Sequence, residues 1–394
     1  MPTMFFMPWT HVKAASNIGP LSFVPYKRCV APNSLGKITQ QSIDAIIGNY
    51  ADRAFIQHAD STVPVNEALI LRWPGDEERD SLLTDDEIQD RLQQAQLLTF
   101  AALAERQFGR HWNYCNTDSL TTIAQNFSED HPAASSITTR RRDGNTSYHM
   151  AGRGGKPIFL RPLHVADQNL LEIDENFARV LLSVPAGPLR DRLLDSIALF
   201  NNSNTDASEV PLSAEIVLMR AALETLVGAT HQTADLKERL VELMAPYLGP
   251  IVWHNVHIQP LRWKDRWNEV RPFSAWVQDF CHWRNESAHG KSATKRHRDP
   301  IWSLCNHLLF TSWLMSRIVK VVLAQEGLYT LTDEDKDELA NIEQFFTYDI
   351  SARDDGGPIY WLTVQSQVQS LQLERILNAS TQITATTGED FGED

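Results

Sequence analysis

Residues 212–228 read LSAEIVLMRAALETLVG, and this stretch decides how the second half of the chain is expected to fold. Its large apolar residues follow one another at intervals of four, three, four and three: Leu212, Ile216, Met219, Leu223 and Leu226. That spacing gathers them on one face of an α-helix, where they meet a core. Gly228 predicts the end of the helix, because glycine readily adopts the left-handed conformation that closes many helices. The stretch therefore predicts a helix packed against other helices.

Helical patterns continue on both sides of this stretch. The sequence predicts further helices over 174–184, 188–200, 234–247, 273–289 and 301–325. The links between them are short, and one of them is a polar loop over 201–210. Five or six consecutive helices with short links are typical of a helical bundle.

The N-terminal part of the chain has a different pattern. Residues 1–75 are irregular and rich in proline, with short β-like pieces at 21–26 and 67–73. Thr84 and Glu87 stand in capping-box register and predict a helix over 85–108. Residues 135–152 hold an Asp-Gly pair between two arms of β-forming residues, which predicts a β-hairpin. The expected fold class is α+β, with a mixed α/β domain followed by an all-α bundle.

Four segments are expected along the chain. Residues 1–166 form the mixed α/β domain, with a sensing or regulatory role, and residues 167–330 form the bundle. Residues 331–379 give a C-terminal helix that starts in the acidic run 332–339, a turn at 354–357 and a short strand at 359–364. The polar residues 380–394 are expected to be a disordered tail.

The bulk composition limits the classes of function. The net charge of −14 argues against a protein that coats nucleic acid, because phosphate would be repelled. Two local basic runs, 140–142 and 291–298, stand out against this acidic background. The start has no signal-peptide pattern, no run of about 18 apolar residues predicts a membrane span, and no two of the four cysteines form a CxxC pair. We expect a cytoplasmic protein.

The residues with chemical potential lie in DFCHWRNESAHG, residues 279–290. Arg284 stands one helical turn after Phe280 and continues the apolar face, and a half-buried arginine needs an anion or a hydrogen-bond partner. Asn285 and His289 are four residues apart, so they share a neighbouring face. The helix dipole favours a protonated imidazole at the C-terminal position of His289. The three side chains are therefore expected to line one cleft that attracts an anion.

Arg284 and His289, with four residues between them, resemble the Rx4–6H signature of HEPN domains (higher eukaryotes and prokaryotes nucleotide-binding). The sequence ALETL at 222–226 looks like the corresponding helix of the ApeA-like branch. The resemblance covers roughly residues 180–328. It implies a helical bundle that forms a homodimer, in which the two Arg/His motifs meet. It also implies a metal-independent endoribonuclease of toxin, abortive-infection or antiviral defence systems, which needs no cofactor.

The resemblance also implies roles for single residues. Arg284 would clamp a phosphate of RNA, His289 would transfer protons, and Asn285 would orient the phosphate or the imidazole. Glu224 matches the family's acidic helix position and would support the site. From charge alone, we expect four basic residues to guide the RNA, whether tRNA or mRNA, to the cleft: Lys291, Lys295, Arg296 and Arg298.

Other interpretations of these residues stay open. Arg284 could form an internal ion pair with Asp279, Glu224 or another acid, and His289 could cap its helix. The bundle could be a non-catalytic nucleotide-binding or dimerisation module, or the main function could lie in an N-terminal domain that binds a trigger ligand or protein. A zinc site and a phosphate loop are both rejected, because HNVH (254–257) lacks paired ligand spacing and GRGGKP (152–157) lacks the required glycine and hydroxyl residue.

Overall fold

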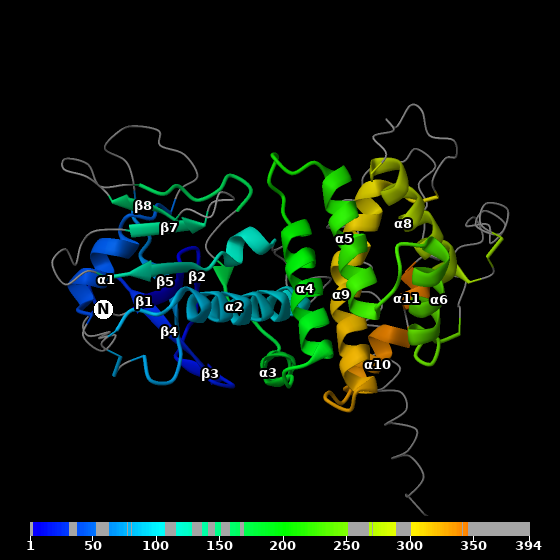
Figure 1. The fold of residues 1–394 in the computed structure, drawn as a ribbon, viewed down its shortest axis with the longest axis horizontal. Helices are drawn as coiled ribbons and strands as arrows, with labels where there is room; N and C mark the ends of the chain where they lie inside the picture. Colours follow the sequence, from blue (N-terminus) through cyan, green and yellow to red (C-terminus); the bar gives the residue numbers. More distant parts are fainter. Residues whose placement is uncertain are drawn as a thin grey trace, which may run out of the picture. The chain divides into compact units, whose positions relative to one another are not determined.

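A computed structural model describes a large part of the chain. The described residues are 3–30, 38–52, 63–76, 78–79, 81–106, 116–127, 136–140, 146–150, 158–165, 169–250, 268–269, 271–288, 301–340 and 342–345, with backbone only for 105–106, 136–140, 146–150, 169 and 344–345. The chain divides into two compact units (Figure 1). Unit 1 holds 1–105, 115–229 and 319–330, and unit 2 holds the remaining residues.

Unit 1 contains an antiparallel sheet of seven strands (Figure 1). The strand order is β3-β4-β5-β1-β6-β7-β8. The bounds are β1 Thr3–Met7, β3 Ser16–Ile18, β4 Leu21–Lys27, β5 Glu67–Arg72, β6 Ile123–Asn126, β7 Ser136–Arg140 and β8 Thr146–Met150. Two further short strands, β2 (Thr10–His11) and β9 (Asn169–Leu170), pair in parallel. The predicted pieces at 21–26 and 67–73 and the hairpin at 135–152 are confirmed.

Helices cover both faces of the central strands. Met4 and Phe6 of β1 and Ile70 of β5 are buried in one apolar cluster with the isoleucines of α1 (Gln40–Ile47). On the opposite face, the guanidinium of Arg91 from α2 (Asp85–Arg106) lies 5.6 Å from the centre of the Phe5 ring. The expectation that residues 1–75 are irregular is therefore wrong. A strand buried on both faces shows a continuous apolar run without alternation, and such a run gives no clear strand signal.

The predicted helix at 85–108 is confirmed over the described residues as α2. Its capping box is formed as expected, because Thr84 Oγ1 accepts a hydrogen bond from the Glu87 amide and the Glu87 carboxylate accepts one from the Thr84 amide. The Thr84 and Arg79 hydrogen bonds lower the pKa of Glu87 to about 2. Further along α2, the Arg91 guanidinium donates two hydrogen bonds to Asp76. These contacts tie the start of α2 to the end of β5.

Three helices complete unit 1 together with the end of α9. They are α3 (Glu175–Ser183), α4 (Pro188–Ser203) and α5 (Leu212–Val227). The Ser196 hydroxyl of α4 donates to the Ala222 carbonyl of α5 over 2.7 Å, and Gly228 ends α5 with a φ of 64°. The predicted helices at 174–184, 188–200 and 212–226 are confirmed, but the predicted loop at 201–210 begins three residues late because α4 continues to Ser203.

Aromatic packing joins these helices to α2. The Phe100 ring of α2 packs against Phe200 of α4 with ring centres 5.4 Å apart, and against Phe177 of α3 with centres 6.0 Å apart. All three side chains are buried. The boundary expected at residues 166 and 167 therefore falls inside unit 1, and the functional division of the chain stays a prediction.

Unit 2 is helical in its described part. It contains α6 (Thr233–Met244), α8 (Pro272–Ala288), α10 (Asp333–Ala340) and the short α11 (Ile342–Phe345). Helix α9 (Leu304–Gln325) belongs to unit 2 up to Ile318 and to unit 1 beyond it. The chain is thus of the α+β class, with an N-terminal antiparallel sheet followed by a helical region. The expected turn at 354–357, strand at 359–364 and tail at 380–394 lie outside the described residues.

Helix α9 also begins later than expected, at Leu304 instead of Ile301. It is the one helix of the described residues that is long and apolar enough to cross a membrane by composition. However, 83% of its most apolar window is buried inside the protein, as in the core helix of a globular protein. Its apolar character is therefore explained by packing.

Candidate functional site

Helix α8 carries the described part of the predicted site and is fixed by an aromatic core. Trp276 is 1% exposed, and its ring packs against Phe273 and Phe280 of the same helix. The Phe310 ring of α9 meets it edge-on, with ring centres 4.9 Å apart. Stacked and edge-on aromatic pairs add to the free energy gained by burial. The helix that carries Arg284 is therefore held firmly on its apolar side.

A buried carboxylate holds the chain that leads into α9. Asp279 is 0% exposed, and its carboxylate accepts hydrogen bonds from the backbone amides of Ile301 and Trp302, each over 3.1 Å. The Nε2 atom of His307, which is also buried, lies 3.0 Å from Asp279 Oδ2. Because a carboxylate only accepts, the imidazole donates from Nε2. These donors compensate for the desolvation of the charge.

A further hydrogen bond joins α8 to the residues before α9. The indole Nε1 of Trp283 donates to the Trp302 carbonyl over 2.8 Å. Helix α9 begins at Leu304 because Ser303 caps it: the Ser303 hydroxyl accepts a hydrogen bond from the Asn306 amide over 3.2 Å. We name the set Asp279, Trp283, Ile301, Trp302 and His307 the α8–α9 clasp. It contacts α8 at Asp279 and Trp283, and Trp283 directly precedes Arg284 and Asn285.

Arg284 and Asn285 lie together near the end of α8. Both side chains are half-buried, and Arg284 Nη1 donates to Asn285 Oδ1 over 3.2 Å. The Nε atom of Arg284 is buried and has no hydrogen-bond partner within the described part of the chain. Over the same residues, no carboxylate lies within ion-pair distance of its guanidinium. The interpretation as an internal ion pair with Asp279 or Glu224 is therefore not supported.

The buried arginines of the described residues each form an ion pair with a carboxylate. Arg91 pairs with Asp76 at 2.6 Å, Arg220 with Glu224 at 2.8 Å and Arg317 with Glu338 at 2.7 Å. Each of these ion pairs neutralises a charge that would otherwise be buried alone. Arg284 is half-buried and donates to a neutral amide, and the half-buried Arg190 likewise donates to a neutral group, the Val184 carbonyl.

Among the other predicted site residues, Glu224 has a structural partner. It holds Arg220, which is 0% exposed, and this pair gives Glu224 a structural role in unit 1. Its part in the site stays a prediction. His289 lies outside the described residues, and so do the four basic residues expected to guide RNA: Lys291, Lys295, Arg296 and Arg298. Among the described residues, no group of three or more His, Cys, Asp or Glu side chains is placed to hold a metal ion.

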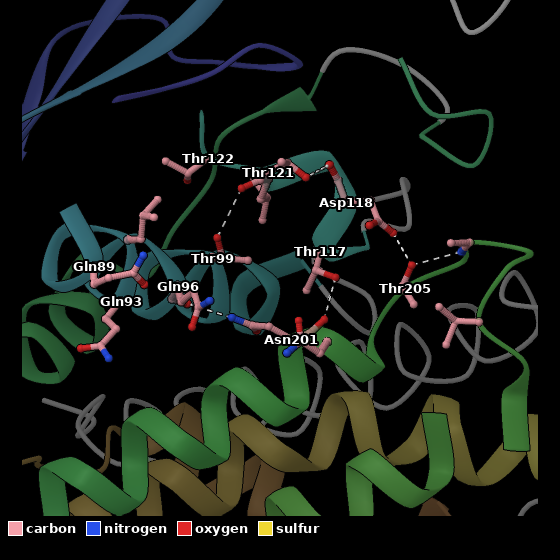
Figure 2. Close-up of a pocket in the computed structure, with 15 residues that line it drawn as sticks. Gln89, Gln93, Gln96, Thr99, Thr117, Asp118, Thr121, Thr122, Asn201 and Thr205 are labelled. Carbon is pink, nitrogen blue, oxygen red and sulfur yellow. Dashed lines mark hydrogen bonds between the residues drawn. The ribbon is translucent and has the colours of Figure 1, made fainter. Parts of the chain in front are cut away.

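Sequence reasoning missed a pocket in unit 1, which Figure 2 shows. It has a volume of about 550 Å³ and lies between α2, the short 3₁₀ helix η1 (Thr117–Leu120) and the end of α4. Its described lining consists of three glutamines, two asparagines, five threonines, one aspartate and four apolar residues. The only sequence signal was Gln89, Gln93 and Gln96, which share one face of α2.

Carboxylates gather beside this pocket. Asp118 lines it and accepts a 2.5 Å hydrogen bond from the Thr205 hydroxyl. Glu215, in the first turn of α5, is 6% exposed. Burial, followed by repulsion from Asp206 and Asp118, raises the pKa of Glu215 to about 7. The Nε2 atom of His164 lies 3.0 Å from Asp118 Oδ2, so this region holds an imidazole beside its carboxylates.

Comparison with known proteins gives no relative from which a function can be transferred. No family model, no curated protein and no solved structure matches the chain. Any function assigned to the chain therefore rests on its own residues and their geometry.

Proposed function

We propose that the chain is a metal-independent endoribonuclease of the HEPN type, with Arg284 as its phosphate clamp and His289 as its proton-transfer group. In the proposed reaction, the 2′-hydroxyl of a ribose attacks the adjacent phosphorus and the bond to the 5′-oxygen breaks. The products are a 2′,3′-cyclic phosphate and a free 5′-hydroxyl. The proton lost by the 2′-oxygen is balanced by the proton gained at the 5′-oxygen, and an imidazole can serve such transfers.

The observation that carries the proposal is the environment of the Arg284 guanidinium in the described part of the chain. Its guanidinium is half-buried, donates to a neutral amide and has no carboxylate partner among the described residues. A guanidinium in this state retains donors for two oxygens of a phosphate. Such an interaction stabilises the negative charge that builds up on phosphorus in the transition state. Asn285, bonded to the same guanidinium, would hold it in position.

The α8–α9 clasp also supports the proposal, because it fixes the helix that carries Arg284. A catalytic group contributes only if it is held in position before the reaction begins. Asp279 and Trp283 anchor the chain after residue 300 to the helix that carries Arg284. The segment with His289 and the basic residues thus connects two fixed ends, Ala288 and Ile301.

The test uses the full-length chain. Phe100 packs against Phe177 and Phe200. Deletion of residues 1–165 would therefore remove Phe100 and expose these two buried rings to solvent. Wild type, Arg284→Ala and His289→Ala are incubated with tRNA and with total RNA in EDTA. Arg179→Ala is the matched control, because this arginine is 53% exposed on α3. We expect cleavage to a cyclic phosphate, and a loss of about 100- to 1,000-fold in Arg284→Ala, the usual effect of removing one transition-state donor.

Two results would contradict the proposal. If wild type and Arg284→Ala cut at the same rate, the residue is not the clamp. If wild type cuts no RNA and its overexpression is not toxic, the non-catalytic module becomes the better interpretation. Formation of a homodimer and a role as a cytoplasmic antiviral effector are parts of the same proposal, and they are tested by sedimentation and by phage challenge of expressing cells.

A further inference from the structure

The polar loop between α4 and α5 is held against η1 by hydrogen bonds between distant parts of the chain. The Thr117 amide donates to the Asn204 carbonyl over 3.0 Å, and the Thr117 hydroxyl donates to the carbonyls of Asn204 and Asn201 over 2.7 and 2.8 Å. The Thr205 hydroxyl donates to the Asp118 carboxylate over 2.5 Å. The partners in the Thr117–Asn204 and Thr205–Asp118 bonds are 87 residues apart. Loss of these bonds would therefore free the loop without breaking a helix.

A second carboxylate takes part in the same attachment. The Asn116 Nδ2 atom donates to Asp206 Oδ2 over 2.8 Å, while Asn116 Oδ1 accepts from the Ser119 amide at the start of η1. Hydrogen bonds to an ionised carboxylate are stronger than those to a neutral group, so the attachment depends on the charges around it. We name the attached set the η1 latch: Asn116, Thr117, Asp118, Asn204, Thr205 and Asp206.

A third carboxyl group lies next to the latch. Glu215 stands in the first turn of α5, shortly after the loop, and is 6% exposed. Among the described residues, the charged groups that act on it are Asp206 and Asp118, and the Nε2 atom of His164 lies 3.0 Å from Asp118 Oδ2. Burial and then repulsion from the two carboxylates raise the pKa of Glu215 to about 7. The group therefore changes its charge near neutral pH.

Ionisation of Glu215 adds a third negative charge to the two carboxylates of the latch. An ionised carboxyl group is costly to bury, and release of the loop would bring it into contact with water. Release would also move Asp206 away and relieve the repulsion. Because the pKa is raised in the folded state, the contribution of this carboxyl group to the attached state is fully present below about pH 4.5. It is lost as the pH rises through 7.

We propose that the η1 latch is a pH-sensitive switch, which keeps the α4–α5 loop attached while Glu215 is protonated and releases it when Glu215 is ionised. Thr117, Asp118 and Thr205 also line the pocket in unit 1, so release changes one wall of that pocket (Figure 2). The switch is independent of the proposed nuclease, and its failure would leave the nuclease proposal untouched.

The experiment follows hydrogen exchange of the Thr117 amide by NMR in the full-length chain at pH 6 and pH 8. Its protection factor compares the measured rate with the intrinsic rate at the same pH, so the pH dependence of intrinsic exchange cancels. We expect a protection factor well below the equilibrium constant for global unfolding in urea, because release leaves the rest of unit 1 folded. If release returns Glu215 to its ordinary pKa of 4.5, linkage predicts that the protection factor falls by about 10-fold from pH 6 to pH 8.

Variants assign the effect to one carboxyl group. Glu215→Gln should remove the fall, and Glu209→Gln, an exposed glutamate of the same stretch, is the matched control that should retain it. Asp206→Asn keeps an oxygen that accepts from Asn116 but removes one repelling charge, so its fall should be smaller than in wild type. The proposal is overturned if Thr117 in wild type is equally protected at both pH values or exchanges only by global unfolding. It is also overturned if the fall persists in Glu215→Gln.

Discussion

Replacing Glu215 by glutamine should change how the stability of the protein depends on pH. Glu215 is 6% exposed, and burial together with Asp206 and Asp118 raises its pKa to about 7 from an ordinary value of 4.5. A raised pKa in the folded state means that folding favours the protonated form. Its contribution is therefore fully present below pH 4.5 and is lost as the pH rises through 7. Glutamine mimics the protonated form at every pH.

The size of the effect depends on the difference between the two pKa values. A difference of one unit between the folded and unfolded pKa values corresponds to about 1.4 kcal/mol. Ionisation of Glu215 should therefore lower the free energy of unfolding of wild type by roughly 2–3 kcal/mol as the pH rises from 5 to 8. The variant should be about equal to wild type at pH 5 and more stable by up to about 3 kcal/mol at pH 8. Urea unfolding followed by circular dichroism at both pH values measures these differences.

The comparison between the two proteins isolates the single carboxyl group. Other groups that titrate between pH 5 and pH 8, histidines among them, are present in both proteins and cancel in the difference. Equal pH dependence in the two proteins would refute the reasoning. So would a variant that is less stable than wild type at pH 8, because it would show that the ionised carboxylate stabilises the fold.

Three further predictions concern single contacts and one backbone conformation. Asp279→Asn should lower the free energy of unfolding by roughly 3 kcal/mol, because its amide NH2 group would face donors that need an acceptor. Urea unfolding measures this loss, and a change below about 1 kcal/mol would show that the Asp279 contacts do not stabilise the fold. Arg317→Ala should lower the free energy of unfolding by roughly 3–5 kcal/mol, because it leaves Glu338 buried alone. Arg284→Ala should lower it by less than about 1 kcal/mol. Equal losses in the same assay would show that Arg284 has a structural partner. Gly228→Ala should lower stability by about 1 kcal/mol, because φ is 64° there while the nearest atom is 3.9 Å from an added Cβ; an unchanged melting temperature would contradict this cost.

The helices were the most predictable part of the fold, and the reason is local. Helix α5 has apolar residues at helical spacing and a glycine at its end, so its bounds can be read from 17 consecutive residues. Helix α9 was predicted to begin at Ile301, because the sequence there is apolar. The helix begins instead after Ser303, whose hydroxyl accepts a hydrogen bond from the Asn306 amide as an N-cap. The amides of Ile301 and Trp302 bind Asp279, which lies 22 residues before Ile301, and local propensity cannot show that contact.

The sheet was harder to predict, because its order is set by distant pairings. Strand β1 pairs with β5 and β6, whose residues lie more than 60 and more than 110 positions away. Strand β1 is buried on nearly all its residues and shows no alternation. Helix α1 was missed because it has only eight residues. Local patterns therefore identified β4, β5 and the hairpin, and left the centre of the sheet unrecognised.

Prediction of the sites met a similar limit. That Arg284 and Asn285 lie together is expected from their adjacency, but the lack of a described carboxylate near Arg284 is visible only in three dimensions. The ion pair of Glu224 was visible in the sequence, because Arg220 is four residues earlier on the same helix. The pocket in unit 1 combines segments from 89 to 210, and Asn201 had no reason to stand out among the polar residues of its stretch.

Because of the α8–α9 clasp, the packing of the two helices does not depend on the number of residues in the connection at 289–300. Asp279 and Trp283 secure the far end of that connection directly to α8, so the helices need no particular number of residues between them. For a chain segment between two fixed ends, the free-energy cost of closure grows only slowly with the number of residues. Evolution can therefore vary this connection by insertion or deletion, and with it the RNA that the proposed nuclease would select, without rebuilding the scaffold beneath it.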